Sequence, residues 1–126
     1  MVTLLTHTDF DGLACAVIVT SMEEVGDIKF TEPGLVQNRE VDVPKGAIIT
    51  DLPWHPAAGL WFDHHASVKP PEKFEGKFDP KAPSAARVCF EYYDNSYVRD
   101  KFSQLVDAAD KIDAAQITEE DVNNPS

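Results

Sequence analysis

The sequence predicts an α/β fold with a mainly parallel sheet and helices on both faces. Short apolar segments, typical of buried strands, alternate along the chain with segments of helical periodicity. Acidic and histidine residues follow three of these strands directly. In a parallel α/β fold, ligands bind beyond the carboxyl ends of the strands. The same pattern therefore predicts both the fold and the place of its functional site.

Four strands are expected. They are Val2–Thr6, Asp27–Thr31, Ala47–Thr50 and Leu60–Phe62. The first is a short apolar run that ends before an acidic turn. The Pro33-Gly34 pair closes the second, and Gly46 and Asp51 bound the third.

Helical segments fill the spaces after the strands. The first helix is expected over Leu13–Glu24, and the second begins at the N-cap residue Ser84 and continues through Tyr93. A long helix over Val98–Ala115 carries apolar residues at helical spacing. Thr118, with Asp121 three residues later, is a capping-box pattern that predicts one last short helix. The final residues, 123–126, are typical of a linker or a cut end.

Length and charge exclude several classes of protein. The 126 residues predict one domain over the whole chain, and 43% hydrophobic residues are enough for a core. A net charge of −11 repels nucleic acid and acidic membranes, so neither duplex nucleic acid nor a membrane is an expected partner. The first residues lack the basic region of a signal peptide, and Cys15 and Cys89 are interpreted as buried free thiols. These features predict a cytoplasmic protein.

Polar residues alternate after the first expected strand. His7, Asp9 and Asp11 would span about 13 Å if the chain were extended, whereas two metal ions in a hydrolase site lie only about 3.5–4 Å apart. The segment must therefore curl if all three serve one site, and Gly12 supplies the backbone freedom for this. A simple polar turn explains the same residues equally well.

Two further strand ends carry acids and histidines. Asp51 follows the third strand, where a lone aspartate is usually a turn or capping residue. Asp63, His64 and His65 follow the fourth strand. Adjacent imidazoles at a strand end can divide their work, one binding a metal and the other facing a substrate. Imidazoles and carboxylates suit manganese, zinc or iron, and the lack of thiolates favours manganese.

The long helix adds acids and bases to the candidates. Asp107, Asp110 and Asp113 are three residues apart and share a face, which a solvated helix surface also explains. Asp110 is the candidate ligand, because it lies at the border between apolar and polar positions. Four basic residues are candidates for phosphate contacts: Arg39, Lys69, Arg87 and Lys111. Arg87 and Lys111 are the preferred candidates.

With these residues, the sequence resembles the DHH phosphoesterase superfamily. Four elements appear in the family's order: His7-Thr8-Asp9-Phe10-Asp11-Gly12, Thr50-Asp51, Asp63-His64-His65 and Ala109-Asp110-Lys111. Together they span residues 7–111. The resemblance is nearest to the exopolyphosphatase-related branch, with family II inorganic pyrophosphatases and single-strand-specific exonucleases as more distant relatives.

The resemblance implies a hydrolase with two divalent metal ions, Mn²⁺ first and Mg²⁺, Co²⁺ or Zn²⁺ as alternatives. It implies these ligands: His7, Asp9 and a bridging Asp51 for one ion, and Asp11, Asp51, His64 and Asp110 for the other. A water bridging the ions would be the nucleophile. His65 would face the scissile phosphate, and Asp63 would orient one of the two histidines.

Two features depart from the family pattern. Only Thr8 separates His7 from Asp9, a shorter spacing than in the pyrophosphatase branch. Family members usually carry a second, C-terminal domain with a glycine-rich, basic motif that binds substrate. No Gly-Gly-Gly-His stretch occurs here, and 11 Lys and Arg stand against 22 acids. The expectation is therefore a metal-binding domain over residues 1–126 without the usual C-terminal domain, either a fragment or a natural short form.

The expected function is hydrolysis of a phosphate ester or anhydride in a phosphate-containing small molecule or oligomer, either polyphosphate or a short oligonucleotide. Two alternatives remain at this stage. One is an inorganic pyrophosphatase-like hydrolase, and the other is a truncated metal-binding domain that is inactive on its own. A homodimer is also left open.

Overall fold

The computed structural model describes the backbone of residues 2–123 and the side chains of residues 2–115. Five parallel strands form one sheet in the order β2-β1-β3-β4-β5. The strands are β1 (Val2–His7), β2 (Val25–Thr31), β3 (Ala47–Thr50), β4 (Ala58–Asp63) and β5 (Gly76–Phe78). The helices are α1 (Phe10–Met22), α2 (Pro33–Gln37), α3 (Ala85–Tyr92) and α4 (Ser96–Asn123). The predicted α/β class with a parallel sheet is confirmed.

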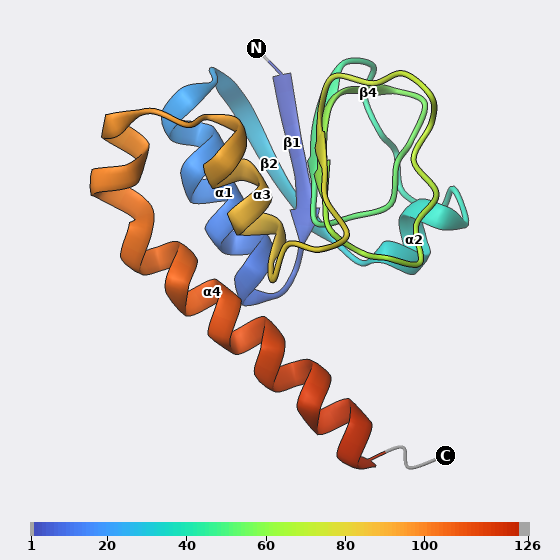
Figure 1. Ribbon diagram of the computed structural model, residues 1–126. Helices are drawn as coiled ribbons and strands as arrows, with labels where there is room; N and C mark the ends of the chain where they lie inside the picture. Colours follow the sequence, from blue (N-terminus) through green and yellow to red (C-terminus); the bar gives the residue numbers. More distant parts are fainter. Residues whose placement is uncertain (1, 124–126) are drawn as a thin grey trace.

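Helices cover both faces of the sheet. Figure 1 shows α1, α3 and α4 on one side of the strands and α2 on the other. Leu4 of β1 packs in the core beneath the three larger helices, whereas its neighbour Leu5 packs in a second core with Trp61 of β4 and Val36 of α2. Successive strand residues point to opposite faces, and here both faces are buried. The central strands are therefore held rigidly, and so are the residues at their ends.

The first helix begins earlier than the sequence pattern predicted. α1 starts at Phe10, because the Asp9 side chain caps it by accepting a hydrogen bond from the Gly12 backbone N–H. The predicted start at Leu13 was wrong, since the polar segment after β1 is itself the first helical turn. Asp11 is thereby carried onto a helix rather than an extended strand.

Two short elements were missed and one helix was divided wrongly. α2 and β5 have only five and three residues, too few for a periodic pattern, and Pro33 begins a helix instead of closing a turn. The separate helix predicted at Thr118 is wrong because α4 continues through it to Asn123. No glycine or proline interrupts residues 115–118, so nothing stops the helix there. The predicted linker beyond residue 123 lies outside the described residues.

The two cysteines are free and buried, as predicted. Cys15 of α1 and Cys89 of α3 belong to the core beneath the larger helices. In the part of the chain described, no helix has both the length and the hydropathy needed to cross a membrane.

Gly12 permits the close approach of α1 to the end of β1, and a side chain there is expected to destabilise the fold. A Cβ atom would lie 2.0 Å from the backbone oxygen of His7. Gly12→Ala should lower the free energy of unfolding by about 2–3 kcal/mol, because the obstacle is backbone that cannot rotate away. Gly34→Ala in α2 is the control, since its Cβ would meet nothing within 4 Å. Urea unfolding of both variants tests this, and equal stabilities would contradict it.

Candidate metal centre

Three neighbouring strands end at one side of the sheet, and their last residues meet there. His7 ends β1, Asp51 follows β3, and Asp63 ends β4 just before His64 and His65. In a sheet of order 2-1-3-4-5, the chain leaves β1 and β3 in opposite directions, so a crevice opens between them. The candidate residues lie at this crevice.

Asp51 lies at the centre of the arrangement. Its side chain is 1% exposed, and its backbone has φ 58°, in the left-handed region that few residues other than glycine adopt. Its Oδ2 atom is 3.4 Å from His7 Nδ1, while Oδ1 is 3.8 Å from His64 Nε2 and 3.9 Å from His65 Nε2. The two oxygens thus face two different groups of side chains. A single carboxylate with this geometry is suited to bridge two cations.

The first group consists of His7, Asp9 and Asp51, whose ligand atoms lie within 4.8 Å of one another. His7 Nδ1 is 3.2 Å from Asp9 Oδ2. The other oxygen of Asp9 accepts the capping hydrogen bond from the Gly12 N–H at 2.8 Å. Helix capping therefore holds one oxygen of Asp9 and leaves the second one directed at His7.

The second group consists of Asp11, His64 and Asp113. His64 Nε2 lies 3.5 Å from Asp11 Oδ2 and 3.4 Å from Asp113 Oδ2. His64 Nδ1 donates to the Ala82 carbonyl oxygen at 3.0 Å, which leaves Nε2 without a proton when the ring is neutral.

Asp11 also receives hydrogen bonds from the start of α3. The N–H groups of Ala85 and Ala86 donate to its two oxygens at 2.8 and 2.9 Å. These N–H groups lack partners within their own helix, and a carboxylate at a helix N-terminus satisfies them. Asp11 is thus fixed between α1 and α3 beside His64.

His65 and Asp63 form a pair beside the two groups. Asp63 is fully buried, and its Oδ1 atom is 2.6 Å from His65 Nδ1. The hydrogen bond with Asp63 raises the pKa of His65 to about 9. The His65 side chain is 41% exposed and lines a cleft that opens to solvent.

The hydrogen bonding of these groups is incomplete in a way that fits cations. Within the described residues, four buried side-chain atoms have no hydrogen-bond partner: His7 Nδ1, Asp51 Oδ2, Asp63 Oδ2 and His64 Nε2. Such atoms are costly unless a ligand satisfies them. Neighbouring ligands of an octahedral ion at ~2.1 Å lie ~3 Å apart, close to the spacings found here.

Protons compensate the buried charge of the site in the metal-free protein. Burial raises the pKa of Asp51 to about 9 and that of Asp11 to about 6. The neighbouring carboxylates of Asp51 and then Asp9 raise the pKa of His7 to about 11. A divalent cation would displace these protons and supply the same compensation.

The structure separates Asp110 from the candidate ligands. Asp110 accepts hydrogen bonds from Ser84 Oγ at 2.6 Å and from Arg87 Nη2 at 2.6 Å. Arg87 also binds Asp107, and Lys111 is exposed. Arg87 and Asp110 therefore tie α3 to α4. Asp113, one of the three equally spaced acids, reaches His64 in place of Asp110 because it lies about one helical turn further along α4.

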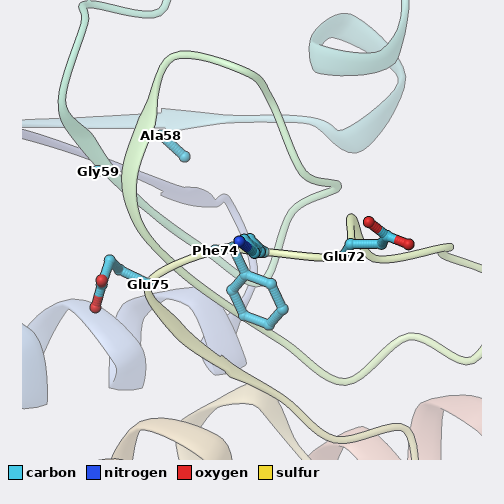
Figure 2. Close-up of a pocket in the computed structure, with 6 residues that line it drawn as sticks. Ala58, Gly59, Glu72, Phe74 and Glu75 are labelled. Atoms are coloured by element: carbon cyan, nitrogen blue, oxygen red, sulfur yellow. The ribbon is translucent and has the colours of Figure 1, made fainter.

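The site opens to solvent through a cleft of about 550 Å³ lined by residues that include His7, His65 and Asp113. Another pocket lies at the opposite, amino-terminal ends of β4 and β5. Figure 2 shows the carboxylates of Glu72 and Glu75 on either side of Phe74, pointing away from each other. This second pocket contains no histidine and does not gather metal ligands.

Comparison with known proteins gives a match among solved structures. No family model matches the sequence, and no curated protein matches it. Among solved structures, the chain is similar to a pGpG-specific phosphodiesterase, PggH from Vibrio cholerae, with 38% sequence identity and a TM-score of 0.78. The match covers all of the present chain, which spans 41% of the length of that phosphodiesterase.

This match supports a DHH phosphoesterase and the α/β fold expected for one. It does not support the exopolyphosphatase branch, to which the sequence motifs had been assigned. The acid and histidine groups at the strand ends are candidates for the divalent metal sites of such an enzyme.

The pairing of Asp63 with His65 predicts a pH dependence in the metal-free protein. A raised histidine pKa means that the folded state binds the proton more tightly, so the stabilisation is complete below about pH 6.5. It is lost as pH rises through about 9. Asp63→Asn should bring the pKa of His65 down toward 6.5, measured by NMR of the ring proton signals. His55, in the loop before β4, is the internal control and should titrate as before; an unchanged His65 would refute the pairing.

Proposed function

We propose that the chain is a divalent-metal-dependent phosphodiesterase that cleaves short linear dinucleotides. The main support for a metal-dependent enzyme is the set of buried side-chain atoms around Asp51 that have no hydrogen-bond partner. His7 contributes such an atom on one side and His64 on the other. Hydrolysis of a phosphodiester with two cations uses this type of site. The substrate class takes its support from the similarity to a pGpG-specific phosphodiesterase.

The residues present divide between two ions. One would be held by His7, Asp9 and Asp51, and the other by Asp11, Asp51, His64 and Asp113. This set differs from the one implied by the resemblance only in replacing Asp110 with Asp113. The carboxylate-rich donor set favours Mn²⁺. When bound, two divalent cations activate a water for attack and neutralise the charge on the phosphate oxygens.

His65 and Asp63 assist at the leaving group. Asp63 accepts a hydrogen bond from His65 Nδ1–H, and because the ring is cationic below about pH 9, Nε2 also carries a proton on the cleft side. This N–H donates to the phosphodiester, and the proton passes to the leaving ribose oxygen as the P–O bond breaks. Because His65 is cationic below about pH 9, it also stabilises negative charge on the phosphate.

A dinucleotide, pyrophosphate and polyphosphate give different products, so one panel of assays distinguishes the proposed substrate from the alternatives. With Mn²⁺, the protein should convert pGpG to two molecules of GMP, detected by chromatography. Pyrophosphate and linear polyphosphate should release little phosphate in a malachite-green assay. EDTA should abolish turnover, and His65→Ala should lower kcat about 10²–10⁴-fold, the usual contribution of general acid catalysis. Phosphate release from polyphosphate alone would reject the dinucleotide proposal, and no turnover at all would favour an inactive metal-binding domain.

Asp113 and Asp110 offer a matched test of the ligand set. Asp113→Asn should weaken binding of one Mn²⁺ ion by about 100-fold or more, since loss of even an indirect partner of a metal ligand costs 10–100-fold. Asp110→Asn should leave Mn²⁺ affinity unchanged but lower the free energy of unfolding by about 1–3 kcal/mol, because Arg87 and Ser84 lose a charged partner. Calorimetric titration with Mn²⁺ and thermal unfolding of both variants separate the two roles. The reverse pattern would restore Asp110 as the ligand.

Two sequence predictions remain predictions: a cytoplasmic location, and a metal-binding domain over residues 1–126 without the usual C-terminal substrate-binding domain. A homodimer also stays open. The described residues that line the cleft include no lysine or arginine, and Arg87 is engaged by Asp107 and Asp110. Binding of a dinucleotide by the residues described here would therefore depend mainly on the metal ions.

A further inference from the structure

We propose that Glu32, a residue outside the proposed metal ligands, is a positioning residue that fixes the tautomer and orientation of His7. Its carboxylate holds the proton on His7 Nε2, so that Nδ1 would present its lone pair to a metal ion that His7 holds together with Asp9 and Asp51. The inference rests on the proposed metal site and concerns a residue that contacts one of the proposed ligands.

The sheet brings Glu32 to this position. β2 runs parallel to β1, with Thr31 beside His7 in the register, so the next residue of β2 lies beside the end of β1. Glu32 is the N-cap residue of α2, but its side chain makes no capping hydrogen bond. The carboxylate instead turns to β1, where Oε2 is 3.0 Å from His7 Nε2 and Oε1 accepts a hydrogen bond from Thr8 Oγ1. Both oxygens of Glu32 thus contact two adjacent residues, His7 and Thr8, at the end of β1.

The acid–base chemistry of the two groups fixes the position of the proton. Glu32 Oε1 accepts from Thr8 Oγ1 and Oε2 lies beside His7 Nε2, and an ionised carboxylate can only accept hydrogen bonds. A neutral imidazole has one N–H and one lone pair. If Nε2 donates to Glu32, the lone pair must lie on Nδ1.

Nδ1 of His7 points into the metal site. It lies 3.2 Å from Asp9 Oδ2 and 3.4 Å from Asp51 Oδ2, and it is buried without a hydrogen-bond partner. A nitrogen that faces two carboxylates must carry a proton or bind a cation, and with the proton held on Nε2 it is free to bind a cation. Glu32 therefore prepares His7 as a metal ligand, in the way that outer carboxylates orient metal-binding histidines in other proteins.

A simple surface ion pair is the competing explanation, and it predicts different results. The Glu32 side chain is 57% exposed, and exposed ion pairs contribute little to stability. Loss of such a pair would leave both metal affinity and the tautomer of His7 unchanged. A positioning role changes both, even where the melting temperature stays the same.

Three variants of the full 126-residue chain separate positioning from charge. Glu32→Ala removes both the acceptor and the charge. Glu32→Gln removes the charge but keeps an oxygen that accepts from Nε2. Glu24→Ala is the matched control, because it removes the same charge from an exposed residue just before β2, at the end of the sheet away from the site.

The measurements are calorimetric titration with Mn²⁺ and long-range ¹⁵N–¹H NMR of the histidine rings with diamagnetic Zn²⁺. In the unmodified protein, His7 should show a protonated Nε2 and a metal-bound Nδ1. Glu32→Ala should weaken one Mn²⁺ binding step about 10–100-fold and mix the His7 tautomers. Glu32→Gln should keep the tautomer and most of the affinity, and Glu24→Ala should change neither.

Each contrary result has a distinct meaning. Equal losses in Glu32→Gln and Glu32→Ala, with the tautomer kept in both, would show that Glu32 acts through charge alone and overturn the positioning role. Unchanged affinity and tautomer in Glu32→Ala would overturn it as well. Absence of any Mn²⁺ binding by the unmodified protein would instead reject the proposed metal site itself.

Discussion

The structure around the site depends on one constraint, the buried negative charge of Asp51. A carboxylate that is 1% exposed and flanked by other acids cannot stay ionised without compensation. The residues that face it directly are His7 on one side and His64 and His65 on the other. The strained left-handed backbone at Asp51 places its two oxygens toward these two sides. Compensation by protons or by cations is therefore required by the fold, and the histidines are arranged to permit either.

The two inner histidines are held in opposite ways by their outer partners. His64 donates from Nδ1 to a backbone carbonyl and directs Nε2 inward, while His7 contacts Glu32 through Nε2 and directs Nδ1 inward. The difference follows from where each histidine lies in the sheet. His7 is the last residue of β1 and lies beside β2, whereas His64 follows β4 and lies against the loop that leads to α3. Backbone geometry thus determines which nitrogen each ring can offer.

The sequence predicted the fold class and most of the site because apolar strands and the polar residues after them are local patterns. His7, Asp51 and Asp63–His65 could be placed at strand ends without knowing the sheet order. The choice between Asp110 and Asp113 could not be made in this way, since residues three apart on α4 share a face and only the packing angle of that helix decides which one reaches His64. Glu32 was missed although it also follows a strand directly. Site residues were expected only after strands that are followed by histidines or clustered acids. A search for polar residues after every strand includes Glu32.

The hydrogen bonds from Ala85 and Ala86 to Asp11 give the protein two internal probes of its site. These amides donate to the same carboxylate that lies beside His64, so any change of charge on Asp11 alters their bonding directly. Their chemical shifts and exchange rates would follow the occupancy of the second group of ligands without any label in the cleft. The start of α3 is in this sense coupled to the chemistry at the sheet edge. The far end of the same helix packs in the core beneath β4.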